Sequence, residues 1–198
     1  MAEITATLVK ELRERTGVSM MECKKALTET GGDLDKAADH LRKMGAAAAA
    51  KKAERVANQG LVDSYIHPGG RIGVLLEVNC ETDFVARTDD FKALVHNLAM
   101  HVAASRPQWV RREDVPAGIL DKEREIYREQ MLREGKPANI VDKIVEGKLG
   151  KFYEENCLLE QPYVRDPDRK INQVIQEAVG KIGENIVLRR FSRFELGA

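Results

Sequence analysis

The sequence predicts an α+β protein, with an N-terminal three-helix unit followed by a larger domain in which helices pack with a three-stranded antiparallel sheet. Three observations predict this class. Apolar residues recur at helical spacing over the first 45 residues, two strand-like runs flank a His-Pro-Gly-Gly segment at 67–70, and helical patterns then continue to about residue 180 before one closing strand. Because strands and helices are segregated along the chain, we expect an antiparallel sheet.

The three N-terminal helices are recognised by their end signals. The first ends at Gly17, Ser19 begins the second with Glu22 at capping-box spacing, and Asp33 caps the third. Met21 faces outward beside Lys24. The inner faces carry small and aliphatic side chains, together with one methionine and one cysteine: Ile4, Leu8, Leu12, Met20, Cys23, Leu27, Leu34, Ala37, Ala38 and Leu41.

A domain boundary is expected at residues 46–58, where five alanines are followed by charged residues. Alanine favours helix but offers little surface to bury, which is typical of a helical linker. The sequence therefore predicts a three-helix domain over 1–45, a helical linker over 46–58 and an α+β core over 59–198.

The core should begin with a hairpin and end with a strand. Runs rich in Leu, Val and Ile form the hairpin, and Thr88 caps the helix that follows. Asp89 and Asp90 in its first turn favour the helix dipole. The expected elements are strands 60–66 and 71–80, helices from 89, over 119–134 and over 138–155, a loop containing Gln161-Pro162 and Asp166-Pro167, a helix over 169–180 and a strand over 185–196.

Composition excludes several classes of protein. The 32 basic and 32 acidic side chains cancel, so the chain lacks the positive surface of a general nucleic-acid binder. Its three cysteines form no CxxC pair, which argues against a disulfide framework or a zinc site. The absence of a signal peptide and of an apolar run near 18 residues predicts a cytoplasmic protein without a membrane segment.

A search for reaction chemistry finds little. The glycine–lysine segments at 147–151 and 180–183 lack the spacing of a phosphate-binding loop. His96 and His101 are five residues apart and cannot share one helical face as metal ligands. We therefore expect no cofactor, no metal and no catalytic residue, although Cys80 paired with a distant histidine stays open as a nucleophile.

The segment after the second hairpin strand is the most informative. Glu81 and Asp83 would share a face in extended backbone and could form an acid–base pair, yet no third group accompanies them. Phe84 is either core or an exposed contact residue, and its place in a turn before Thr88 favours exposure. An exposed aromatic beside a carboxylate favours an interface with another protein.

Three stretches resemble the elongation factor Ts family, the nucleotide exchange factors of bacterial elongation factor Tu. They are residues 12–27 (LRERTGVSMMECKKAL), 77–87 (EVNCETDFVAR) and 159–164 (LEQPYV), and the resemblance covers nearly the whole chain. It implies that the chain binds elongation factor Tu–GDP and promotes GDP release during translation elongation, without covalent chemistry.

The resemblance also implies roles for particular residues. The three-helix unit is similar to ubiquitin-associated domains and would dock on the partner through Arg13, Val18, Met20, Met21 and Lys24. Residues Thr82, Asp83, Phe84, Val85 and Ala86 would enter the partner near its nucleotide and dislocate its magnesium ion.

Only one hairpin-containing half of the family's core is visible, as in the family's short form, which implies a homodimer that binds two copies of elongation factor Tu in a 2:2 complex, with no direct nucleic-acid contact. Two alternatives remain at this point. One is a ubiquitin-associated-like adaptor without exchange activity, and the other is an enzyme with a polar pocket around Cys80, Asp83 or a histidine.

Overall fold

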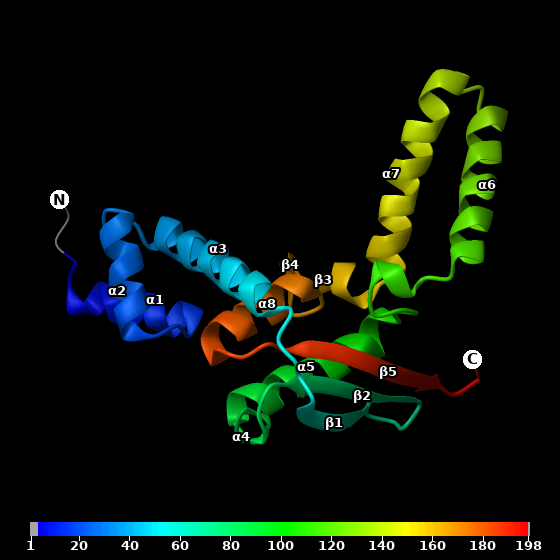
Figure 1. Ribbon diagram of the computed structural model, residues 1–198. Coiled ribbons are helices and arrows are strands. Elements are labelled where there is room, and N and C mark those ends of the chain that lie inside the picture. The colour runs from blue at the N-terminus through cyan, green and yellow to red at the C-terminus, as the bar shows by residue number, and fades with distance from the viewer. Residues whose placement is uncertain (1–3, 198) are drawn as a thin grey trace. The chain divides into compact units, whose positions relative to one another are not determined.

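The computed structural model describes residues 4–197, so residues 1–3 and 198 of the expected domains lie outside the described part. Its helices are α1 (Ala6–Thr16), α2 (Met20–Glu29), α3 (Leu34–Lys52), α4 (Asp83–Ala86), α5 (Asp89–Ser105), α6 (Ala117–Arg133), α7 (Ala138–Asn156) and α8 (Ile171–Ile182), with short 3-10 turns η1 (Arg112–Asp114) and η2 (Leu158–Glu160) (Figure 1). Its strands are β1 (Gln59–Ile66), β2 (Ile72–Cys80), β3 (Pro162–Tyr163), β4 (Asp166–Lys170) and β5 (Val187–Glu195).

The principal sheet is antiparallel with strand order β1-β2-β5, which confirms the predicted α+β class and the closing strand. The hairpin closes where the His67 amide donates to the Ile72 carbonyl at 2.9 Å. Gly60 permits the close approach of β1 to β2, because a Cβ there would lie 2.1 Å from the Val78 carbonyl oxygen.

The contacts of the chain divide it into two compact units. The first contains the N-terminal segment up to Val62 together with Glu77–Val95 and Gln173–Leu188. The second contains Asp63–Leu76, His96–Asn172 and the residues from Arg189 onward. The candidate site described below lies in the first unit.

The N-terminal helices of the first unit end and begin as the sequence predicts. Gly17 adopts the left-handed conformation after α1, Ser19 accepts from the Glu22 amide, and Asp33 accepts from the Lys36 amide. Instead of bonding back to the Ser19 backbone, the Glu22 carboxylate accepts from the Ser19 hydroxyl at 2.8 Å. The helices share a small core of buried residues: Val9, Leu12, Cys23, Ala26, Leu27, Ala37 and Leu41.

The expectation that Met20 packs inward is wrong. Its side chain is 42% exposed, and Met21 is 78% exposed. Met20 is the first residue of α2, and helical side chains lean toward the helix N-terminus, so no earlier turn of α2 lies beneath it. Both methionines are therefore exposed.

The alanine run continues α3 instead of forming a separate helix. The helix includes residues 46–52 and ends at Lys52, whereas residues 53–58 form a turn and an extended segment leading into β1. The expectation of helix over 53–58 was therefore wrong, while the domain boundaries at 45 and 58 stay a prediction.

In the second unit, α6 and α7 form a helical hairpin (Figure 1). They bury their own cluster of Met131, Val141, Val145 and Leu149. The expected loop after α7 in fact holds η2 and the β3–β4 hairpin, and α8 begins at Ile171 instead of near 169. Strands of two and five residues containing prolines carry too weak a periodic signal to predict.

His101 anchors the segment after α7. Its ring is fully buried, its Nδ1 accepts from the Val164 amide at 3.2 Å, and its Nε2 donates to the Gln161 side-chain oxygen at 3.0 Å. The Gln161 amide group donates in turn to the Ser105 and Glu155 carbonyls. Burial lowers the pKa of His101, because a charged ring would lose its hydration.

Stability should therefore fall on acidification. The folded-state pKa of His101 lies below the unfolded value, so the unfolded chain binds more protons at acidic pH. The contribution of this group to the free energy of unfolding is therefore largely present above about pH 6.5, and it declines as the pH falls below that value. Urea titrations of the wild type should show a slope of up to about 1.4 kcal/mol per pH unit from this group. The His101→Gln variant should lose that slope, and His96→Gln, at a half-exposed ring, should keep it. An identical slope in wild type and His101→Gln would refute the assignment.

Candidate functional site

The candidate site is the turn between β2 and α5, which contains the short helix α4. Thr82 is its N-cap, and the Thr82 hydroxyl accepts from the Val85 amide at 3.3 Å. The next two residues, Asp83 and Phe84, form the tip of this turn, and Phe84 is 77% exposed. A large aromatic side chain exposed to this degree would gain free energy if it were buried against another molecule, so Phe84 is a candidate contact residue.

The other predicted site residues of the turn face the opposite way. Val85 and Ala86 are buried and fasten the back of α4 to the core, so the exposed members of the predicted set are Thr82 and the tip. Asp83 forms an ion pair with Arg87 at 2.7 Å, and both side chains are largely exposed. Sequence reasoning missed this partner, although an acid and a base four residues apart are the usual signal.

The idea that Glu81 and Asp83 form an acid–base pair on one face of a strand was wrong. β2 ends at Cys80 and α4 begins at Asp83, so the alternation of an extended strand does not reach Asp83. Glu81 bonds instead to Arg55 and to the Asn185 amide. Cys80 is a buried free thiol whose pKa is raised by burial, as expected of a small apolar residue at a strand end.

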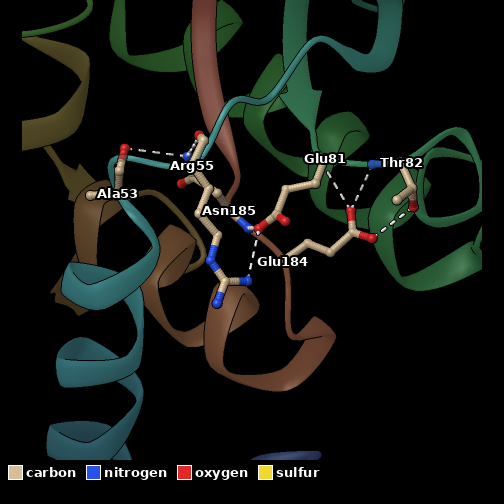
Figure 2. A network of polar contacts seen from close by, with 6 residues as sticks. All are labelled: Ala53, Arg55, Glu81, Thr82, Glu184 and Asn185. Atoms are coloured by element: carbon tan, nitrogen blue, oxygen red, sulfur yellow. Dashed lines mark hydrogen bonds and ion pairs between the residues drawn. The ribbon is translucent and has the colours of Figure 1, made fainter.

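A network of polar contacts holds the start of the turn, at Glu81 and Thr82 (Figure 2). The Glu184 carboxylate accepts from the Glu81 amide, the Thr82 amide and the Thr82 hydroxyl, at 3.0, 3.0 and 2.7 Å. The Glu81 carboxylate accepts from the Asn185 amide at 2.7 Å. We call these residues, with Arg55, the Glu81–Glu184 network. The sequence pattern gave no indication of it, because its two halves are about 100 residues apart.

The second group of predicted site residues lies around the turn between α1 and α2. Arg13, Met20, Met21 and Lys24 are exposed and Val18 is half-buried, and together they are called the docking face below. Arg13 and Val18 also line a hollow of about 600 Å³, whose other wall includes Asp90 and Lys181. These two residues are an ion pair at 2.8 Å, and the Lys181 side chain packs over Gly17.

Neither surface resembles a reaction centre. Among residues 4–197 no group of three or more histidine, cysteine or acidic side chains could hold a metal ion. His101 is engaged within the core, and His96 pairs with Asp63 at 3.6 Å. Within the same range of residues, none of the helices combines the length and the apolar character needed to cross a membrane.

Comparison with known proteins identifies the family. The family model for elongation factor TS matches residues 2–198. The chain is 63% identical to elongation factor Ts of Thermoanaerobacter pseudethanolicus over 194 residues, which are 98% of this chain and 95% of that protein. It is 64% identical to the Heliobacterium modesticaldum protein of that name and 60% identical to that of Geobacter sulfurreducens, in each case over 98% of this chain and 90% of the relative. The chain belongs to the elongation factor Ts family.

Proposed function

We propose that this protein is a cytoplasmic guanine nucleotide exchange factor that binds elongation factor Tu–GDP and promotes GDP release, so that GTP can bind during translation elongation. The observation that carries the proposal is the exposed Phe84 beside Asp83, held on a turn whose base is buried and hydrogen-bonded. Membership of the family supports the choice of partner. No covalent bond changes in this activity, so the protein is not an enzyme in the strict sense.

The tip would act by insertion. Burying an aromatic ring of this size contributes roughly 2–3 kcal/mol, which is enough to favour one of two packed arrangements in the partner. A magnesium ion neutralises the phosphate charge of bound GDP, so disturbing the ligands of that ion weakens the binding of GDP. By linkage, bound GDP lowers the affinity of elongation factor Tu for the exchange factor by the same factor as the exchange factor lowers its affinity for GDP. Either ligand therefore promotes release of the other.

We further assign the predicted domains to separate tasks. Residues 1–45 would dock on the partner through the docking face, and residues 46–58 would link this domain to the core. Residues 59–198, the core, would carry the tip and the contact with a second copy. Exposed methionines beside a lysine form an adaptable contact surface, since the thioether is flexible and polarisable.

A second copy of this chain would cover the exposed face of the sheet in the second unit. We call this the apolar sheet face; it consists of Ile66, Leu75, Phe194 and Leu196, which are 49–71% exposed and surround a shallow hollow of about 520 Å³. A patch of this kind is typical of a surface covered by protein, and a two-fold contact of the patch with itself would give the 2:2 complex expected for the family's short form.

Truncating the Phe84 side chain at the tip should slow nucleotide exchange without preventing association. Phe84→Ala should slow the stimulated release of fluorescent GDP from elongation factor Tu at least about tenfold, because the inserted ring is lost. Stopped-flow measurement at saturating protein checks this. Val164→Ala, which trims another half-exposed apolar side chain, serves as the matched control and should release GDP like the wild type. An unchanged rate in Phe84→Ala would exclude insertion of the ring.

The docking face should determine affinity instead of rate. Met21→Ala and Lys24→Ala should each raise the Kd for elongation factor Tu about three- to tenfold, since each removes one interface contact. Calorimetry gives the Kd, and the release rate at saturation should be unchanged. Lys43→Ala removes an exposed lysine from α3 and should bind normally. If both substitutions leave the Kd unchanged, the docking face is wrongly assigned.

The oligomeric state tests the apolar sheet face. Wild type should sediment at twice the monomer mass of 22.2 kDa, and Phe194→Asp should sediment as a monomer, because a carboxylate cannot be buried unpaired in an apolar contact. A wild type that sediments at 22.2 kDa would remove the dimer from the proposal.

If the protein forms a complex with elongation factor Tu but does not accelerate GDP release, the result would favour the ubiquitin-associated-like adaptor over the exchange factor.

A further inference from the structure

We propose that Glu184 is a positioning residue for the tip: its carboxylate fixes the backbone of residues 81–82 and thereby sets the direction in which Phe84 points. The inference rests on the proposed function and deepens it, because it names a residue outside the contact surface on which exchange should depend. Glu184 lies just after α8, about 100 residues from the turn that it holds.

The geometry makes Glu184 a three-point acceptor. Its Oε2 accepts from the amides of Glu81 and Thr82, each at 3.0 Å, and its Oε1 accepts from the Thr82 hydroxyl at 2.7 Å (Figure 2). Hydrogen bonds to an ionised acceptor are stronger than neutral ones. Two consecutive amides and a hydroxyl directed at one carboxylate leave the peptide plane between these residues little freedom.

Thr82 passes this constraint on to α4. Its hydroxyl also accepts from the Val85 amide, which starts the helix, and its carbonyl accepts from the Cys80 thiol at 3.1 Å and the Ala86 amide at 3.3 Å. Every polar atom of the residue before the tip is therefore bonded. Within the tip, Asp83 pairs with Arg87, whereas the exposed Phe84 ring has no polar group, so its direction follows from the backbone that carries it.

Glu184 is held in place by its own surroundings. Gly183 follows α8 in the left-handed conformation, with φ of +89°, and reverses the chain. The amide of Asn185, the residue after Glu184, donates to the Glu81 carboxylate at 2.7 Å. The segment after α8 and the turn after β2 therefore each donate a hydrogen bond to a carboxylate of the other. The Asn185 side chain donates to the carbonyls of Ala53 and Arg55, which adds the segment after α3 (Figure 2).

A misdirected tip would affect the step in which the ring inserts more than it would affect docking. Removing the carboxylate lets the turn sample several directions, and only a fraction of these aligns Phe84 with its receiving site. The maximal rate of GDP release should then fall, while the Kd, determined largely by the docking face, should change less.

The test compares two substitutions of one residue in the full-length protein. At saturating protein, Glu184→Ala should lower the rate of GDP release from elongation factor Tu by about tenfold or more, and Glu184→Gln should stay within about threefold of wild type, because an amide oxygen can still accept both backbone bonds. Glu154→Gln removes a carboxylate that pairs with Lys170 in the second unit, and it should behave like the wild type.

A readout without the partner separates local loosening from general destabilisation. Amide hydrogen exchange at Glu81 and Thr82 should become faster in Glu184→Ala, whereas Val78, in the interior of β2, should keep its protection. Equal loss of protection at all three amides would mean a purely structural role and would overturn the proposal.

The outcomes distinguish the two proposals. A wild type that leaves GDP release unchanged overturns the exchange function, and with it the role of Glu184. A wild type that accelerates release, together with a Glu184→Ala variant that is equally fast at saturation, overturns the role of Glu184 alone. Slow release in Glu184→Ala with recovery in Glu184→Gln supports both.

Discussion

The arrangement of the candidate site depends on one reciprocal exchange of hydrogen bonds between backbone and carboxylate. Glu184 accepts from the amides of residues 81 and 82, and Glu81 accepts from the amide of Asn185. Each segment supplies carboxylate acceptors for amides of the other that lie at the end of a strand or helix, beyond the regular hydrogen bonds of that element. With this exchange in place, β2 can stop at Cys80, α4 can begin at Asp83, and the chain after α8 can enter β5.

The site therefore combines a rigid base with a solvent-exposed end. Val85 and Ala86 pack inward, Thr82 is fully bonded, and Phe84 projects into water. In a chain whose aromatic content is only 5%, the exposed Phe84 ring is apolar surface that the core does not use. This exposure is understandable if the ring is buried in a partner, and the docking face shows the same pattern with two exposed methionines.

Local signals in the sequence predicted most of the fold. Gly17, Ser19, Asp33 and Thr88 delimit helices through contacts within four residues, and the hairpin follows from its loop and its apolar runs. The exposure of Phe84 followed from its place in a turn. Contacts between distant segments left no such trace, because nothing near Glu184 in sequence indicates that it binds Thr82. Periodicity also failed at Met20, since a stripe on a helix does not reveal where the neighbouring helices stop.

The ion pair between Asp83 and Arg87 has a consequence for the first encounter with a partner. An unpaired carboxylate at the exposed tip would be repelled by any surface that displays nucleotide phosphates. Arg87, at 2.7 Å, cancels that charge while both side chains remain hydrated and able to separate. In a chain with no formal net charge, the rate of encounter with such a surface should then depend little on ionic strength.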